Sequence, residues 1–417
     1  MNILLINHFP LEGSGSGTYT KNLAMQLVAR GHKVCVIMPE NNPDYARYEG
    51  IKLHPVMFTP AAGPAPSGAL PFNFPCFTTH PASATTFGSL NSEQLEAYLG
   101  AFREALEQEM ESFAPDVVHG QHLWMLSGLA AAYEVPLVVT AHGTDLMGYD
   151  KWLALRDYAN QAAQACKKII CISKDNEDLV LKTFPAQAGK VVRMSNGYNP
   201  AIFYPQDINP AEELVCYGVP YKGERIVLMA GKLTHFKGVD VLLEAAVYYG
   251  KGGATSGLAP ASGAAPASGL APAITLIAGD GALRAELEEQ AQRLGLDQVY
   301  FLGNVSQEDL CRLYSCANVD VVPSRREPFG LVAVEAMACG TPVVVTNEGG
   351  LSDFVNESVG ALVPVEDAPA LAQAIDEVLA RAQANPAWRQ FIAGYASSSY
   401  SQAAIIEELE DLYRSVL

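Results

Sequence analysis

Short runs of apolar residues recur along the chain, and segments with helical periodicity separate most of them. In the first half the apolar runs are NILLIN, HKVCVIM, IKLHPVMF, DVVHG, PLVVTAH, KKIICIS and KVVRMSNG. Helical patterns lie over 18–30, 92–113, 150–166 and 174–184. Continuously apolar strands that alternate with helices predict a parallel sheet covered by helices on both faces.

A second series of the same kind begins at RIVLMAG. It continues through ITLIAG, VYFLGN, VDVVPS, PVVVT and GALVPV, again with helical patterns between the runs. Two such series predict an α/β protein with two doubly wound, Rossmann-like lobes facing each other across a cleft. A chain of 417 residues also exceeds the usual size of a single core.

The boundary between the lobes is expected near SNGYNPAIFYP, where Asn, Gly and Pro interrupt the pattern. This places an N-terminal lobe over 1–198 and a C-terminal lobe over 199–399. A final helix within 400–417 is expected to cross back to the first lobe. An insert at 252–273 contains the tandem repeats SGLAPA, SGAAPA and SGLAPA. Such a composition buries too little surface to offset chain entropy, so it predicts a disordered surface loop.

Charge and composition narrow the function. The formal net charge is −18, and the residues after Tyr198 hold 13 basic and 27 acidic side chains, a net of −14. Such a surface repels nucleic acid and anionic membranes, so any anionic ligand must be held by a few local cations. The chain has no apolar run of transmembrane length, and its eight cysteines form no CxxC pair. A cytoplasmic enzyme without strong membrane association is the expectation.

The loop PSRREPFG follows an apolar strand and therefore lies at the carboxyl edge of the predicted sheet, where doubly wound proteins bind ligands. The amides of Gly330, Leu331 and Val332 start the next helix and form an anion site. Glu327 precedes this helix, and Glu335 lies about two turns inside it. A buried carboxylate needs donors, and a ribose diol supplies two. The alternative is that Glu335 pairs with a core arginine and Glu327 complements the helix dipole.

The segment LMAGKLTHFKGVDVLLEAA has a strand that ends at Gly231 and a helix that begins near Gly238. Lys237 stands at the start of this helix, which is the unfavourable end for a cation unless an anion binds there. Lys232 lies in the same loop. Two lysines at the carboxyl edge of a parallel sheet suit a diphosphate, and the alternative is that both are solvated surface residues.

The first lobe offers weaker signals. Gly15, Ser16 and Gly17 belong to a glycine-rich loop before the helix at 18–30, which either approaches a phosphate or is only a flexible turn. His142 follows the strand PLVVTA at its carboxyl edge, where a capping or core histidine is the alternative. His122 and His80 are more typical of structural positions than of acceptor contacts.

In combination, the GKL…FKG loop, the EPFGLVAVE stretch and the following AMACGTPVV resemble the retaining glycosyltransferases of family 4, which have the GT-B fold. The resemblance implies that Lys232 and Lys237 hold the donor pyrophosphate. It implies that Glu327 holds hydroxyls of the donor sugar and that Glu335 holds the ribose. Lys232 stands where the family often has Arg, so bidentate pairing is lost at that position.

The resemblance also implies a base-binding strand end around Asn304 and Val305, and we place Gly231 and Phe329 in the same donor-binding set. In similar enzymes the glycine-rich loop closes on the donor phosphates, and a histidine at the place of His142 lies against the donor sugar. Asp145 is expected to orient that histidine or to contact the acceptor.

The function expected from these features is transfer of a hexose, with retained configuration, from a nucleoside diphosphate sugar to an unidentified small-molecule or glycan acceptor. A UDP-sugar is the expected donor on family grounds. No Asp-x-Asp occurs in the chain, so neither a metal nor another cofactor is expected. One alternative is a nucleotide-sugar epimerase of the same fold, which would need acid and base carboxylates at the sugar, where only Glu327 is evident. The other is a non-catalytic nucleotide-sugar binding protein.

Overall fold

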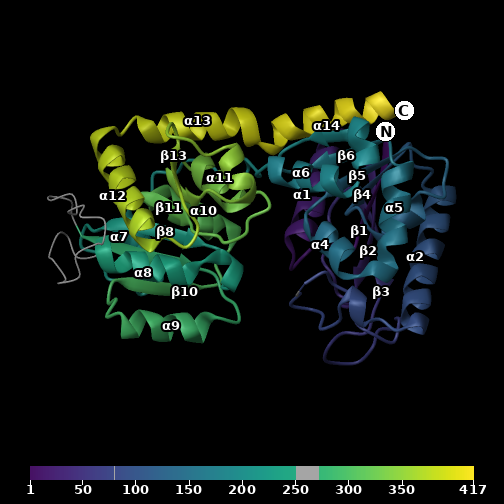
Figure 1. Ribbon diagram of the computed structural model, residues 1–417, viewed down its shortest axis with the longest axis horizontal. Helices are drawn as coiled ribbons and strands as arrows, with labels where there is room; N and C mark the ends of the chain where they lie inside the picture. Colours follow the sequence, from purple (N-terminus) through teal and green to yellow (C-terminus); the bar gives the residue numbers. More distant parts are fainter. Residues whose placement is uncertain (79, 250–271) are drawn as a thin grey trace. The chain divides into compact units, whose positions relative to one another are not determined.

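The computed structural model describes residues 1–78, 80–249 and 272–417, and the chain divides into two compact units. Unit 1 comprises Met1–Asn196 and Ile405–Leu417, and unit 2 comprises Gly197–Ala404. Each unit contains one parallel sheet with flanking helices, which Figure 1 labels. The predicted α/β fold with two Rossmann-like halves is confirmed.

Unit 1 follows the order of the apolar runs closely. Its elements are β1 (Asn2–Asn7), α1 (Gly15–Ala29), β2 (Lys33–Glu40), β3 (Ile51–Met57), α2 (Ser92–Ser112), β4 (Val117–Gln121), α3 (Met125–Ala130), β5 (Leu137–Ala141), α4 (Thr144–Lys151), α5 (Arg156–Ala165), β6 (Lys168–Cys171), α6 (Lys174–Thr183), β7 (Val191–Arg193) and most of α14 (Gln402–Val416). The sheet order is β3-β2-β1-β4-β5-β6-β7. The order reverses between β1 and β4, and their last residues, Asn7 and Gln121, are paired.

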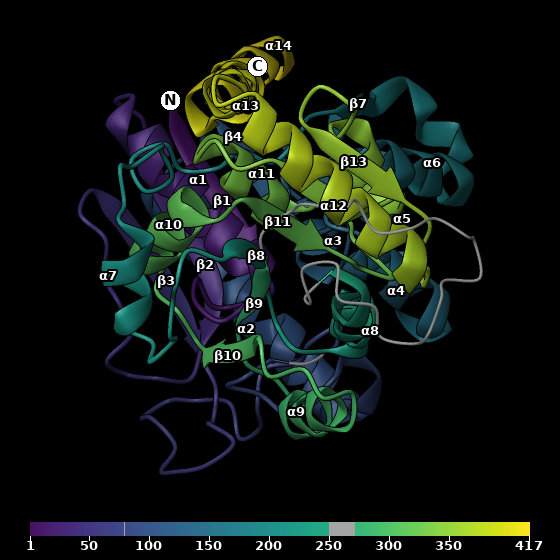
Figure 2. The same cartoon turned by 90° about the vertical axis from the view of Figure 1, so that its left-hand side faces the viewer.

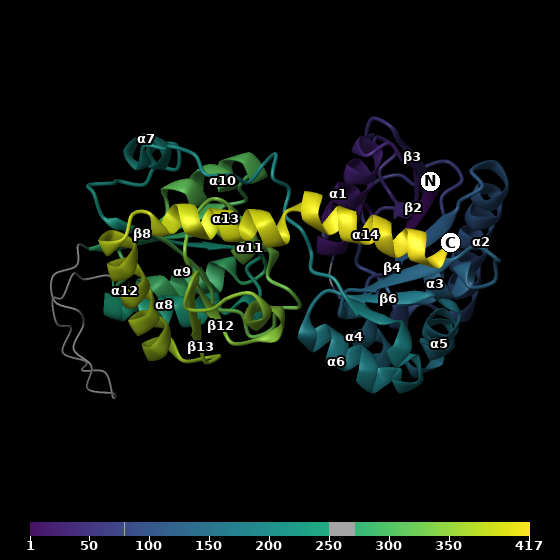
Figure 3. The same ribbon diagram turned by 90° about the horizontal axis from the view of Figure 1, so that it is seen from above.

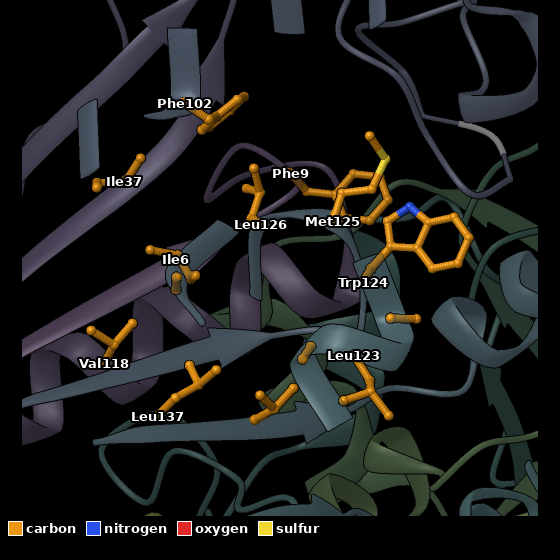
Figure 4. Packing of buried hydrophobic residues seen from close by; sticks show 14 of the residues in the cluster. Ile6, Phe9, Ile37, Phe102, Val118, Leu123, Trp124, Met125, Leu126 and Leu137 are labelled. Atoms are coloured by element: carbon orange, nitrogen blue, oxygen red, sulfur yellow. The ribbon is translucent and has the colours of Figure 1, made fainter. Parts of the chain in front are cut away.

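The two faces of this sheet carry separate cores because successive residues of a strand point to opposite sides. Ile3 and Leu5 of β1 pack with apolar residues of α1 and α14. Leu4 and Ile6 pack with α2, α3 and α5 in a larger core that is rich in aromatic side chains. Figure 4 shows part of this second core, where Phe9, Trp124 and Met125 lie close together beyond the end of β1.

Unit 2 repeats the same plan. Its elements are α7 (Pro210–Val215), β8 (Arg225–Ala230), α8 (Val239–Tyr249), β9 (Ala273–Ala278), α9 (Arg284–Arg293), β10 (Val299–Gly303), α10 (Gln307–Cys316), β11 (Val319–Val322), α11 (Leu331–Ala338), β12 (Val343–Thr346), β13 (Gly360–Val363), α12 (Ala368–Ala384) and α13 (Trp388–Tyr400). The sheet order is β10-β9-β8-β11-β12-β13, so the order reverses between β8 and β11. Doubly wound sheets bind ligands beyond the carboxyl ends of the two strands at such a reversal.

The helices of unit 2 form two groups. Helix α8 contacts both α9 and α12, and α11 contacts both α10 and α13. Right-handed crossovers place the two groups on opposite faces of the sheet, and Figures 2 and 3 show the unit from two further directions. The helix that precedes the reversal, α10, and the one that follows it, α11, therefore pack on the same face.

Two expectations about local structure need correction. The helix expected over 150–166 is two helices, α4 and α5, because Trp152 leaves the helical conformation with φ −117° and ψ 79°. The Ser-rich stretch near 397–400 belongs to α13, and the break falls at Ser401. The low-complexity insert over 252–273 lies outside the described residues except for its last two positions, of which Ala273 begins β9. Among the described helices, none combines the length and apolar character needed to cross a membrane.

Candidate functional site

The two loops at the strand reversal of unit 2 are packed directly against each other. The first loop follows β8 and contains Gly231, with φ 152°, and Gly238, with φ 64°. A Cβ atom at Gly238 would lie 2.0 Å from the carbonyl oxygen of Pro323, in the loop that follows β11. Only glycine allows this approach in that backbone conformation, so the two loops are held together by their backbones.

Lys237 and Glu327 form an ion pair across these loops. The Lys237 Nζ atom lies 2.5 Å from Oε2 of Glu327, and the Ser324 hydroxyl donates to the same oxygen at 3.3 Å. The Glu327 side chain is only 9% exposed. The two residues predicted to bind the donor phosphates and the donor sugar are therefore each other's partners in this structure.

Lys232 differs from Lys237. It is exposed, and its ammonium group has no ion pair with any residue that the structure describes. Its backbone carbonyl accepts a hydrogen bond from the amide of Thr234 at 2.8 Å, which tightens the loop between the two lysines. The loop thus presents one free cation and one paired cation at the same sheet edge.

Arg325, which sequence reasoning missed, fastens the two loops together. Its guanidinium group donates to both carboxylate oxygens of Asp240, at 2.8 and 2.7 Å, and its Nε donates to Glu366 at 2.7 Å. Its backbone amide donates to the carbonyl oxygen of Phe236 at 2.8 Å. These hydrogen bonds to carboxylates raise the pKa of Arg325 above its usual value. Because Phe236 and Asp240 flank Lys237 in sequence, Arg325 fixes the loop that carries this lysine.

Helix α11 places Glu335 beneath the same edge. The helix begins after Gly330, whose φ is 99° and where a Cβ atom would lie 2.3 Å from Leu351. Glu335 is 6% exposed, and burial raises the pKa of its carboxyl group to about 8. The expected alternative, a pair with a core arginine, is wrong for the part of the chain that the structure describes, where the carboxylate has no ion pair or hydrogen bond.

The other residues assigned to the donor set occupy different environments. Phe329 is buried, and its ring packs 5.3 Å from that of Phe354, so its side chain belongs to the core. Leu331 and Val332 are half-buried at the start of α11. Asn304, which is exposed, and Val305 follow β10 as expected.

Two glycine-containing loops at this edge were also missed. Gly279 follows β9 with φ 145°, and a Cβ atom there would lie 1.9 Å from the carbonyl oxygen of Gly231. Gly349 follows β12 with φ 54°, and a Cβ atom there would lie 1.9 Å from the carbonyl oxygen of Glu327, which also accepts the Gly350 amide at 3.0 Å. The signal was present in the sequence, because AGDG and TNEGG come directly after apolar strands.

In unit 1, the glycine-rich segment is part of a helix and not a loop before it. Helix α1 begins at Gly15, and its N-cap Ser14 accepts a hydrogen bond from the Gly17 amide at 3.0 Å. A Cβ atom at Gly17 would lie 2.1 Å from the carbonyl oxygen of Pro10, so this glycine is required by packing. The Ser16 carbonyl oxygen accepts the Thr20 hydroxyl at 2.7 Å.

His142 lies directly after β5, as expected. Its Nε2 atom is 3.1 Å from Oε1 of Gln121, the last residue of β4. Burial lowers the pKa of His142 to about 4, so the ring is neutral at physiological pH. A neutral imidazole both donates and accepts hydrogen bonds, which suits hydroxyl groups.

The three remaining residues have structural contacts. Asp145 is fully buried, and its carboxylate accepts the Leu123 amide at 2.7 Å, while burial raises the pKa of the carboxyl group to about 6. His80 accepts the Ala82 amide at 3.1 Å. His122 is fully buried with its ring 5.0 Å from that of His142. The Asp145 carboxylate also accepts the Leu146 amide at 3.1 Å, so it fixes the backbone at the end of β4 and the start of α4. The role expected for Asp145 in orienting His142 or in contacting the acceptor stays a prediction.

Comparison with known proteins agrees with this arrangement. Residues 13–202 match the family described as Glycosyltransferase Family 4, and residues 218–393 match the one described as Glycosyl transferases group 1. The chain is 30% identical to the D-inositol 3-phosphate glycosyltransferase of Mycolicibacterium smegmatis, over 91% of this chain and 83% of that protein. The chain belongs to glycosyltransferase family 4.

Solved structures show the same fold. This glycosyltransferase superposes on the sucrose-phosphate synthase of Thermosynechococcus elongatus with a TM-score of 0.71 and 26% identity, covering 99% of this chain and 98% of that one. Anabaena HepE in complex with UDP and glucose gives a TM-score of 0.69 with 18% identity, covering 99% of both chains. The glycosyltransferase therefore has the GT-B fold.

Proposed function

We propose that this glycosyltransferase moves a hexose from a nucleoside diphosphate sugar, with UDP as the nucleotide, to a hydroxyl group of an acceptor and retains the anomeric configuration. The observation that carries the proposal is the Lys237–Glu327 pair, with 2.5 Å between Nζ and Oε2, at the strand reversal of unit 2. The Anabaena structures in complex with UDP and with UDP-glucose support the nucleotide and the type of donor.

The charges of this site suit a diphosphate leaving group. Lys232, Lys237 and the unpaired amides at the start of α11 would share the negative charge that develops on the departing phosphate. Glu327 would accept hydroxyl groups of the donor sugar, and Glu335 would accept the ribose hydroxyls. The loop at 304–305 would contact the base.

We assign Glu327 to the donor sugar and assign no carboxylate as a covalent nucleophile, so the proposed reaction takes place in one step on one face of the sugar. The acceptor oxygen attacks the anomeric carbon from the face on which the phosphate leaves. The bond between the anomeric carbon and the phosphate oxygen breaks, and the acceptor proton passes to a phosphate oxygen. Because no Asp-x-Asp occurs in the chain and two lysines are available, activity should persist in excess EDTA. Loss of activity in EDTA that Mn²⁺ restores would contradict this part of the proposal.

A thermal-shift screen against nucleoside diphosphates and their sugars tests the proposal directly. A ligand at about 100 times its Kd should stabilise the folded protein by roughly 2.7 kcal/mol. Incubation of the protein with the donor alone, followed by chromatography of the sugars, separates a transferase from an epimerase, which would convert the donor without any acceptor.

The Lys237→Ala variant tests the role of the cation, with Lys222→Ala, a change at an exposed position of the same unit, as the matched control. We expect kcat/KM to fall at least about 100-fold in the first variant only. The melting temperature of Lys237→Ala should also fall, because Glu327 loses its partner in a nearly buried position. Near-normal turnover by folded Lys237→Ala would refute the pyrophosphate assignment.

A further inference from the structure

The end of β4 carries an unusual concentration of unpaired polar atoms. Among the residues that the structure describes, Gln121 Nε2, both ring nitrogens of His122 and Trp124 Nε1 are buried without a hydrogen-bond partner. These three side chains are at most 1% exposed. A buried polar group without a partner costs about 1–3 kcal/mol, so several of them within four residues call for an explanation.

The backbone of this segment is held firmly while its side chains are left unpaired. His122 has a φ of 127°, which is strained for a residue with a side chain. Its carbonyl oxygen accepts the Ser127 hydroxyl at 2.7 Å and the Trp124 amide at 2.8 Å. The Asp145 carboxylate accepts the Leu123 amide. The surrounding structure thus imposes the conformation that presents these polar atoms.

Aromatic rings surround these atoms, and the charged group held against the same segment is an acid, the Asp145 carboxylate. The Phe77 ring lies 4.9 Å from that of His122 and 5.6 Å from that of Trp124. Figure 4 shows the Trp124 indole within this core. Burial lowers the pKa of His122 well below its usual value, so the ring is neutral. A neutral imidazole, an amide and an indole N–H are groups that bind hydroxyls, and aromatic faces pack against the C–H faces of sugar rings.

No lysine or arginine contacts these three side chains within the described part of the chain. The ammonium group of Lys151 is 5.1 Å from the Trp152 ring. That ring is in turn 6.2 Å from the Trp124 ring. A phosphate group placed at the end of β4 would therefore lack a positive partner, and burying it there would be costly.

We propose that Gln121, His122 and Trp124 bind hydroxyl groups of an uncharged acceptor, a sugar or a cyclic polyol without a phosphate group. The proposal rests on the proposed transferase function and names the acceptor class of that reaction. It separates this chain from the relatives named D-inositol 3-phosphate glycosyltransferase, whose acceptor is anionic. Since the unpaired atoms have no solvent contact, a local rotation of the neighbouring side chains accompanies binding.

Acceptor use can be measured with matched pairs of probes. The donor found in the thermal-shift screen is incubated with glucose, fructose and myo-inositol, and in parallel with glucose 6-phosphate, fructose 6-phosphate and inositol 3-phosphate. Mass spectrometry detects the glycosylated product, and nucleotide release gives the rate. We expect product, or inhibition of donor hydrolysis, with at least one neutral probe and at least tenfold lower kcat/KM with its phosphate ester.

Single substitutions test whether the acceptor binds at the end of β4. Trp124→Phe removes one N–H group and keeps an aromatic ring. Trp388→Phe makes the same change in unit 2, where the Trp388 Nε1–H already donates a hydrogen bond to the Ser358 carbonyl oxygen, and serves as the matched control. We expect Trp124→Phe to raise the KM for the neutral probe about tenfold and to leave the KM for the donor unchanged. We expect Lys151→Gln to change neither value.

The possible results distinguish a wrong acceptor class from a wrong proposed function. Product from phosphate esters alone, sensitivity of acceptor use to Lys151→Gln, or no effect of any neutral probe on product or hydrolysis would overturn the assignment of the acceptor class. An unchanged acceptor KM in folded Trp124→Phe would show that the unpaired atoms hold only water. Failure of every nucleoside diphosphate sugar to bind would instead refute the proposed function, whatever the acceptor results.

Discussion

Glu335 should lose a proton when the nucleotide binds. Burial raises the pKa of this carboxyl group to about 8, so at pH 7 about nine in ten molecules carry it protonated. A ribose diol that donates two hydrogen bonds favours the ionised form and lowers this pKa. Binding at pH 7 should then release close to one proton from Glu335, about 0.9 if the pKa in the complex falls well below 7.

Calorimetry measures this proton directly. The nucleotide is titrated at pH 7 into protein in phosphate and in Tris, whose ionisation enthalpies differ, and the difference in heat gives the number of protons released. Glu335→Gln keeps the size of the side chain but removes the titrating group, so its proton count is the reference for protons lost from the nucleotide itself. The ratio of wild-type to variant affinity should rise about tenfold per pH unit up to pH 8 and then level off. Equal proton counts for both proteins would refute the assignment of Glu335 to the ribose.

Three further changes test other parts of the site and fold. Glu327→Gln releases Lys237 from its ion pair, so UDP alone should bind as tightly as before or more tightly, while kcat/KM for the UDP-sugar falls. Isothermal titration measures the affinity for UDP, and initial rates give kcat/KM. Weaker binding of UDP would contradict the assignment of Lys237 to the phosphates and of Glu327 to the sugar. A lysine at position 325 cannot make the bidentate contact with Asp240, so Arg325→Lys should raise the KM for the donor about tenfold in initial-rate measurements. An unchanged KM would show that Arg325 does not position the loop that carries Lys237. Glu410 in α14 has its pKa lowered to about 2 by hydrogen bonds and charges, so it stabilises the fold fully above about pH 4.5 and progressively less as the pH falls toward 2. The difference in melting temperature between wild type and Glu410→Gln should therefore shrink below pH 4.5, and a difference that stays constant from pH 7 to pH 3 would speak against this ion-pair role.

The two sheets were predictable because the sequence pattern that marks a strand spans only a few consecutive residues. Most strands of the two parallel sheets coincide with an apolar run, and a glycine follows several of them, as Gly231 follows β8. Strand order could be expected from the alternation of strands and helices, since a doubly wound sheet has few possible topologies. The positions of Lys237 and Glu327 at one edge followed from that order alone.

The contacts between these positions were not predictable in the same way. Lys237 and Glu327 are 90 residues apart, and their pairing depends on the close approach of Gly238 to Pro323. Arg325 was overlooked because nothing in SRRE distinguishes a surface arginine from one that clamps Asp240. Whether two such residues pair depends on how close the folded chain brings them, and a pattern of neighbouring residues in the sequence does not contain that information.

At the start of α1, tertiary packing outweighs the low helix propensity of glycine. Glycine is unfavourable in a helix by about 1 kcal/mol relative to alanine, which favoured a loop over 13–17. The structure nevertheless includes Gly15 and Gly17 in the first turn, since Ser14 caps the helix and a side chain at Gly17 would collide with the backbone of Pro10. Gly17 is therefore explained by close packing at the start of the helix and not by flexibility.

The ion pair of Lys237 and Glu327 gives the proposed donor site a property that neither residue has alone. A bare nucleoside diphosphate would take Lys237 as a phosphate partner and would leave Glu327 uncompensated in a position where its side chain is only 9% exposed. A nucleoside diphosphate sugar would supply hydroxyl donors to Glu327 at the same time, so both members of the pair would exchange partners without loss. Within the proposed function, this ion pair would favour the complete donor over the spent nucleotide, and so would favour product release after transfer.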